Sequence, residues 1–209
     1  MIARTSRLEQ ALQYGLSSLD AVTSGALCAP TPCAGWDLAA LLRHLRESLS
    51  ALREGAGTGR IELVEPADGG PTGRGTEPET AEHLVADLRL AATGLALEWR
   101  RMPNTISHLE IDDLHLGVAV VEVVAAIEIA VHGWDIFESC RSPRPIPVRL
   151  ALDLLRQSSI LVDATVRPAL FGAPIEISAL ASPSDRLVAF LGRRGTCRSR
   201  PRRCGDFPA

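Results

Sequence analysis

The chain has 209 residues, an apolar content of 46%, few aromatic side chains and a formal net charge of -3. This length suits one principal hydrophobic core, and the small net charge excludes the overall electrostatic signature of a nucleic-acid-binding or membrane-surface protein. The N-terminus lacks the charged-then-apolar pattern of a signal segment, so a cytoplasmic location is expected. The odd number and scattered spacing of the cysteines argue against a disulfide framework and predict reduced thiols at Cys28, Cys33, Cys140, Cys197 and Cys204.

The first part of the chain indicates two amphipathic helices. Residues 5–24 carry apolar side chains at spacings of three and four, which predicts a helix with one buried face. The proline- and glycine-containing segment CAPTPCAGW breaks this helix. Asp37 is then placed to cap a second helix that ends near Glu54 and buries the leucines Leu38, Leu41, Leu42, Leu45, Leu49 and Leu52.

A long connection precedes the third predicted helix. Gly55 to Gly75 is rich in Gly, Pro and Thr and has little periodic apolar content, so it is expected to be a crossover. Thr76, followed by Glu77 and Pro78, predicts the start of a helix that runs to about Arg101. The next segment, ISHLEIDDLHL, matches neither strand nor helix spacing well and is expected to be a loop.

The fourth predicted helix has the sequence GVAVVEVVAAIEIAVHGWDIF. Its length from Val118 to Phe137 would suffice to span a bilayer. No aromatic belt flanks it, however, and it is interrupted by the ionisable side chains of Glu122, Glu128, His132 and Asp135. These features favour the central helix of a soluble bundle over a membrane span.

The C-terminal part predicts two further helical segments and a tail. SPRPIP ends the fourth helix, a fifth runs from about Val148 to Thr165, and the shorter SDRLVAFLGR ends near Arg193. The predicted fold is therefore an all-α bundle over residues 1–193. Residues 194–209 are arginine-rich without apolar periodicity and are expected to form a disordered basic tail. Because the tail has no interleaved aromatic residues, we expect it to attract anionic surfaces non-specifically rather than to bind a particular nucleic acid or membrane.

Glu128 and His132 are the strongest candidates for chemistry. Their spacing of four residues stacks both side chains on one face of an apolar helix. A buried carboxylate needs a compensating cation or strong hydrogen bonds. A divalent metal ion would satisfy this need, since imidazole and carboxylate are zinc ligands, and an arginine would also satisfy it.

His44 supplies a third candidate ligand. It lies on the second helix on the side of Ala40, Ser48 and Ala51, about 110° around the helix from the leucine stripe. Taken alone, a histidine at such a position is more often a partly exposed structural residue than a metal ligand. Together with the pair on the fourth helix, it would complete a three-ligand set with an open coordination position.

The other polar candidates have weaker spacing. Asp135 lies on the face of Glu128 and either orients a ligand or makes a helix-end hydrogen bond. Glu122 is displaced by about 120° from Glu128 and is expected to pair with an arginine instead. The remaining histidines, His83, His108 and His115, have no partner at metal-ligand spacing. Of these, His115 is a candidate for the mouth of the site.

Cys33, Trp36 and Trp134 have structural interpretations as well as functional ones. Cys33 forms no Cys-x-x-Cys pair, which favours a buried structural thiol over a redox or nucleophilic one. Each tryptophan directly follows a glycine at a predicted helix end, where its ring would pack to close the end of the bundle. Stacking on a substrate is the alternative role for these rings.

Three segments, PTPCAGWDLAALLRHL, EIAVHGWDI and SDRLVAFLGR, resemble those of the DinB-like metal-binding bundles. The similarity is to the actinobacterial branch related to mycothiol-dependent maleylpyruvate isomerase and covers roughly residues 8–193. It implies a four-helix bundle with a long crossover that holds a divalent metal, zinc or nickel, through His44, Glu128 and His132. Nothing after residue 145 resembles the separate C-terminal domain of that isomerase.

The resemblance also implies a chemistry. Enzymes of this family use a low-molecular-weight thiol, here inferred to be mycothiol, for transfer to a small electrophile or for thiol-assisted isomerisation. The expected partners are therefore that thiol and that electrophile, and a homodimer is compatible with the sequence. A non-catalytic bundle with a structural or sensing metal, or a biosynthetic enzyme that uses the metal without a thiol, is the alternative function.

Overall fold

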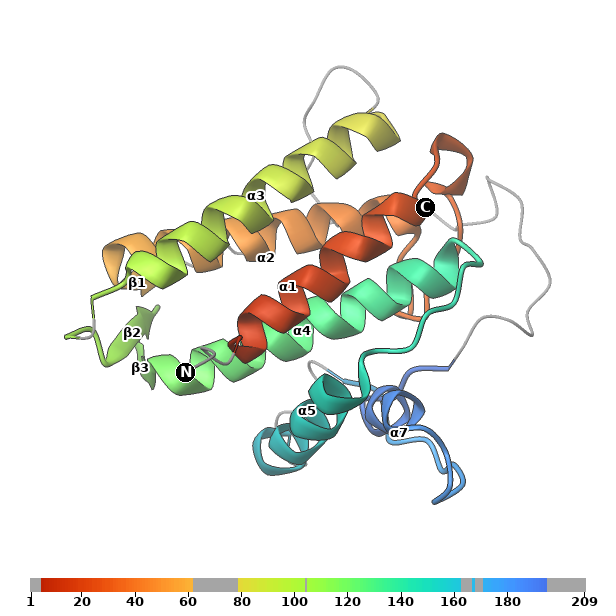
Figure 1. Cartoon of the computed structure of the whole chain (residues 1–209). Helices are drawn as coiled ribbons and strands as arrows, with labels where there is room; N and C mark the ends of the chain where they lie inside the picture. Colours follow the sequence, from red (N-terminus) through yellow and green to blue (C-terminus); the bar gives the residue numbers. More distant parts are fainter. Residues whose placement is uncertain (1–4, 62–78, 104, 163–166, 168–170, 195–209) are drawn as a thin grey trace.

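A computed structural model describes residues 5–61, 79–103, 105–162, 167 and 171–194. Six α-helices and three short strands occur within these ranges (Figure 1). The prediction of a mostly helical bundle is confirmed. Beside its helices, this all-α fold carries a small three-stranded sheet at one end of the bundle (Figure 1).

Four long helices form the bundle. They are α1 (Arg7–Ser18), α2 (Leu38–Thr58), α3 (Ala81–Arg101) and α4 (Val118–Ser139). Figure 1 shows α1 and α4 running in one direction and α2 and α3 in the other, with α1 packed on α4 and α2 on α3. Since α2 and α3 are parallel neighbours, a crossover must join them, as the sequence predicts. Residues 62–78 of that connection lie outside the described ranges.

Side chains at the helix starts explain where the helices begin. Oδ1 of Asp37 accepts a hydrogen bond from the backbone N–H of Ala40 at 2.8 Å, so the predicted cap of α2 is confirmed. The helix continues past Glu54 and ends at Thr58, with Gly59 as its C-cap. Thr80 caps α3, whereas the predicted cap Thr76 lies outside the described residues.

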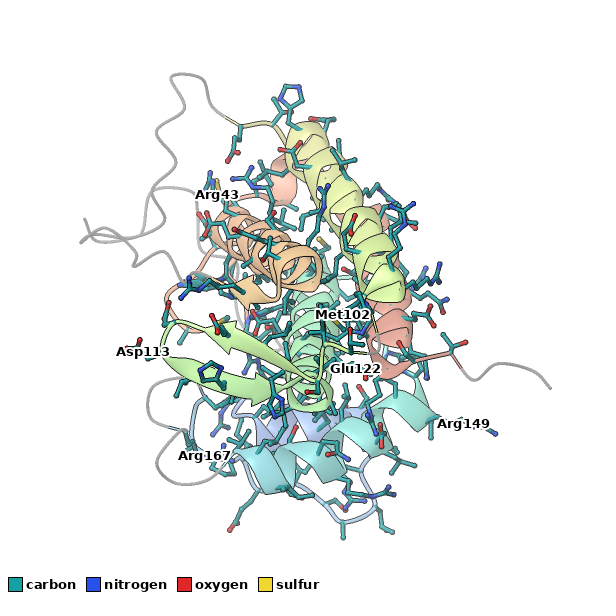
Figure 2. The ribbon with its side chains drawn as sticks, turned by 90° about the vertical axis from the view of Figure 1, so that its left-hand side faces the viewer. Arg43, Met102, Asp113, Glu122, Arg149 and Arg167 are labelled. Carbon is teal, nitrogen blue, oxygen red and sulfur yellow. The ribbon has the colours of Figure 1, made fainter. Side chains whose placement is uncertain are left out.

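The segment expected to be a loop contains a β-hairpin. Strands β2 (His108–Ile111) and β3 (Leu114–Gly117) are antiparallel, and β1 (Arg60–Ile61) pairs with β2 in parallel. Strands of four residues are too short to show a clear alternation of apolar and polar side chains in the sequence. Their turn contains Asp112 in the left-handed region, with a φ of 48°. Asp113 marks this turn in Figure 2, at the end of the bundle where α4 begins.

Helix α4 forms the centre of the core. Its second half is buried on nearly every side, which explains its uninterrupted apolar sequence. It approaches α1 closely at Gly133, where a Cβ would lie 3.0 Å from Cα of Gly15. None of the helices in the described ranges combines the length and the apolarity that a membrane crossing requires.

Two shorter helices pack beside the bundle. They are α5 (Val148–Leu161) and α7 (Pro183–Phe190), which contact each other below α4 in Figure 1. Both predicted C-terminal helices are thus confirmed, although α5 ends before Thr165, which is outside the described residues. Residues 195–209, most of the predicted tail, are also outside them.

The cysteines differ in part from expectation. Cys33 and Cys140 are free thiols, as predicted. The prediction is wrong for Cys28, which is disulfide-bonded. Burial raises the pKa of Cys140 to about 11, so this thiol stays protonated at neutral pH.

Candidate metal centre

The packing of α2 against α4 brings His44, Glu128 and His132 together. One candidate ligand atom from each residue lies within 4.8 Å of the other two. Nε2 of His44 is 2.7 Å from Oε1 of Glu128, and Nε2 of His132 is 3.5 Å from the same oxygen. The helical spacing of four residues therefore stacks the α4 pair as predicted, and α2 adds the third member across the interface.

The group is closed on one side and open on the other. The His132 side chain is only 5% exposed, whereas those of Glu128 and His44 are 32% and 36% exposed. His132 is thus fixed within the core of α4, while Glu128 and His44 reach solvent. An ion bound among them would have two protein ligands near the surface and one at the base of the site.

The charge of Glu128 is compensated by the two histidines. Burial alone would raise its pKa, but interactions with His132 and His44 outweigh burial and hold the pKa well below its usual range. The hydroxyl of Ser48 adds a hydrogen bond to Oε1 at 3.3 Å. No arginine contacts Glu128 within the described part of the chain, so the alternative of an arginine partner is not supported.

Asp135 contacts the far side of the His132 ring. Its Oδ2 lies 3.0 Å from Nδ1 of His132, and its side chain is fully buried. Because a carboxylate only accepts, Nδ1 carries the proton and Nε2 faces Glu128. Of the two predicted roles for Asp135, the structure therefore supports the orientation of a candidate ligand.

Asp135 also has a second, distant partner. Nε of Arg193 lies 3.5 Å from Oδ2 of Asp135. The other carboxylate oxygen, Oδ1, is buried and has no hydrogen-bond partner among the described residues. Sequence patterns gave no indication of this contact, because it joins residues 58 positions apart.

Trp36 packs on the candidate ligands. Its ring centroid lies 4.6 Å from that of His44 and 6.4 Å from that of His132. Trp134, in contrast, is buried in the core, which fits its predicted structural role. Trp36 is only partly buried, and its ring lies beside both histidines of the group.

Cys33 precedes Trp36 in the same connection. Burial raises the pKa of its thiol, although the charge of Arg193 acts in the opposite direction. A raised pKa reduces the fraction of nucleophilic thiolate at neutral pH. This favours the predicted structural role of Cys33 over a reactive one.

The other candidates lie apart from the group. Glu122 is near the hairpin end of α4 in Figure 2 and belongs to no metal-compatible cluster among the described residues. His115 is on β3, which ends at Gly117, and α4 then rises by about 15 Å from Val118 to Glu128. Its placement at the mouth of the site is therefore wrong, and Nδ1 lies instead 3.9 Å from Glu110.

Two of the three donor separations are close to those that a bound divalent metal requires, and the third is within 4.8 Å. Tetrahedral zinc with nitrogen and oxygen ligands at about 2.0–2.1 Å separates those ligands by roughly 3.3 Å. The 3.5 Å between His132 and Glu128 already meets this spacing. The 2.7 Å hydrogen bond from His44 to Glu128 would lengthen by about half an ångström as the ion replaced its proton. The group could thus hold a metal ion through three side chains.

A family model agrees with this arrangement. The model of the mycothiol maleylpyruvate isomerase N-terminal domain matches residues 8–137, which is more than half of the chain. The chain belongs to this family. The match contains the four bundle helices almost entirely and includes His44, Glu128 and His132. The resemblance stated from the three sequence segments is therefore confirmed.

A solved structure shows the same DinB-like fold. The crystal structure of a mutant of the mycothiol-dependent maleylpyruvate isomerase superposes with a TM-score of 0.51 at 15% sequence identity. The superposition covers 71% of this chain and 66% of the isomerase chain, slightly under two thirds of its length. No curated protein sequence is significantly similar to the chain.

Proposed function

We propose that the chain is a metal-dependent enzyme that uses a low-molecular-weight thiol, with mycothiol as that thiol. His44, Glu128 and His132 would hold a divalent ion, zinc or nickel. The observation that carries this proposal is the convergence of their donor atoms within 4.8 Å inside a domain of this family. Reaction with a small electrophile, by S-transfer or by thiol-assisted isomerisation, is the proposed activity.

The donor set supports catalysis more than a purely structural ion. Structural zinc sites are usually closed by four protein ligands, whereas catalytic sites combine three protein ligands with an open position. Within the described residues, the cluster contains three members. A bound divalent ion with an open position would lower the pKa of a coordinated thiol and so supply thiolate at neutral pH.

The chain's own side chains would orient the reactants. Trp36 offers an apolar ring edge beside His44, against which a small electrophile could pack. Ser48 offers a hydroxyl 3.3 Å from Glu128. With these groups fixed on helices or next to them, a bound thiol and an electrophile would meet in a restricted orientation.

Two other functions make different predictions. A non-catalytic bundle would bind the metal but show no saturable affinity for a thiol. A biosynthetic enzyme that works without a thiol would bind its substrate whether or not mycothiol is present. The half-exposed Glu128 and His44 favour catalysis over a purely structural ion, because a structural ion needs no access to solvent.

Calorimetric titration of mycothiol into the zinc-loaded and metal-free proteins tests the proposal. Saturable binding to the loaded protein, lost in the metal-free protein and in Glu128→Ala, is the expected result. Glu122→Ala, on the same helix but outside the group, should bind like the wild type. Equal affinity with and without zinc would contradict thiol activation, and no binding in either form would favour the non-catalytic or thiol-free function.

A further inference from the structure

Arg193 connects the C-terminal helix to the candidate metal centre. It follows α7, yet its side chain is only 10% exposed and lies against α4. Its Nε is 3.5 Å from Oδ2 of Asp135, the oxygen that also accepts from His132. The family match ends at residue 137, so Arg193 lies outside the part of the chain that the match covers.

The end of α7 holds the backbone of Arg193 in a defined turn. Gly192 takes a φ of 79°, and its N–H donates to the carbonyl of Ala189 at 3.0 Å. The N–H of Arg193 donates to the carbonyl of Val188 at 2.9 Å. These two bonds and the left-handed residue form a Schellman motif, which ends the helix in a fixed geometry.

The guanidinium is held at both of its sides. Its Nη1 donates to the carbonyl of Leu191 at 3.2 Å, while Nε faces Asp135. A planar guanidinium with two fixed donors loses little further freedom when it contacts a carboxylate. The turn and the local bond therefore direct Arg193 toward α4 before any metal is involved.

Arg193 gives Asp135 a cationic partner besides His132. Its carboxylate has no exposed surface, and one of its oxygens has no partner among the described residues. Burying a carboxylate without a positive partner is unfavourable, and the neighbouring Glu128 adds a second negative charge to the site. Within the described ranges, Arg193 is the arginine that contacts Asp135.

We propose that Arg193 is a positioning residue of the metal centre, an inference that rests on the proposed function. Arg193 fixes the Asp135 carboxylate, and Asp135 in turn holds His132 with Nε2 directed toward Glu128 and His44. Helix α7 is then part of the metal centre although it provides no ligand. The chain Arg193–Asp135–His132 runs from the C-terminal helix to the base of the site.

Zinc affinity and the visible absorption spectrum of the Co²⁺-substituted protein test this role. Arg193→Gln should weaken zinc binding about 10- to 100-fold, the range typical when an outer partner of a ligand is lost, and should alter the Co²⁺ bands. Arg193→Lys should lie closer to the wild type because it keeps the charge. Arg194→Gln, at the exposed neighbouring residue, should match the wild type.

The double variant Asp135→Asn/Arg193→Gln shows whether Arg193 acts through Asp135. Because it removes both charges, it keeps the test open even if Arg193→Gln alone does not fold. Its zinc affinity should equal that of Asp135→Asn alone, since the two residues act in series. A further loss in the double variant, or wild-type affinity and spectrum in Arg193→Gln, would overturn the proposal. Absence of zinc binding in the wild type would instead remove the metal centre itself.

Discussion

Nδ1 of His132 lies 3.0 Å from Oδ2 of Asp135, one helical turn further along α4. Because the carboxylate can only accept, Nδ1 keeps its proton, and Nε2 is the ring nitrogen that could bind a metal ion. Nε2 is left to face Glu128 and, across the helix interface, His44. A single hydrogen bond in the core of the bundle thus determines the direction of the candidate ligand at the base of the site.

Asp135→Asn should weaken zinc binding about 10- to 100-fold without removing the site. An amide can still accept from Nδ1, but the charge that strengthens this hydrogen bond is lost. Chelator competition would measure the zinc dissociation constant. Glu122→Gln is the matched control on the same helix, and an unchanged constant in Asp135→Asn would show that the contact does not support metal binding.

Gly133→Ala should destabilise the bundle by about 1–3 kcal/mol, the cost typical of overpacking. Its Cβ would lie 3.0 Å from Cα of Gly15 and 3.3 Å from the Tyr14 ring, so α1 would have to move away from α4. Since Gly133 follows His132 directly, zinc affinity should fall as well. Chemical denaturation measures the free energy of unfolding.

Gly57→Ala provides the control for this substitution. Gly57 lies in α2, and a Cβ there would meet no atom within 4 Å. Helix propensity predicts a neutral or slightly stabilising effect of up to about 1 kcal/mol. If both variants unfolded at the same denaturant concentration as the wild type, the close approach of α1 and α4 would not restrict the side chain at residue 133.

The metal-free protein should lose stability as the pH rises from about 6.5 to 9. Burial opposes protonation of His132, but Glu128 and Asp135 outweigh burial and raise its pKa from 6.5 to about 9. A pKa that is higher in the folded state stabilises the fold fully below the unfolded value, and this contribution disappears above the folded value. The loss should be on the order of 3 kcal/mol at most. Thermal denaturation across this range would measure it, and His132→Gln should remove the dependence.

Zinc binding at pH 7 should release the proton held by His132. Zinc and the proton compete for Nε2, so zinc affinity should increase with pH up to about 9. Calorimetric titrations in buffers with different ionisation enthalpies count the released protons. A binding heat that does not depend on the buffer would contradict the raised pKa.

The parts of the site that could be predicted from the sequence depend on local periodicity. A spacing of four residues in an apolar helix identifies Glu128 and His132, and the small residues around His44 mark a face with room for an ion. The cap at Asp37 also follows from a local rule. These patterns repeat within one or two helical turns and need no knowledge of the tertiary fold.

The remaining features depend on contacts between distant segments. The β2–β3 hairpin is short, and its pairing with β1 joins residues about 50 positions apart, which no local spacing indicates. Arg193 reaches Asp135 only because α7 packs beside the bundle. Ser48 could have been identified as a neighbour of His44, since it follows that residue by one helical turn. Its hydrogen bond to Glu128, however, depends on the packing of α2 against α4.

Elemental analysis of the purified protein, wild type beside Glu128→Ala, tests the central claim most directly. Glu128 contacts both histidines of the group, so its removal should eliminate the site. The account predicts close to one zinc or nickel ion per wild-type chain and almost none in Glu128→Ala, with both proteins helical by circular dichroism. Equal metal content in the two proteins, or a metal-free wild type that takes up neither zinc nor nickel, would contradict it.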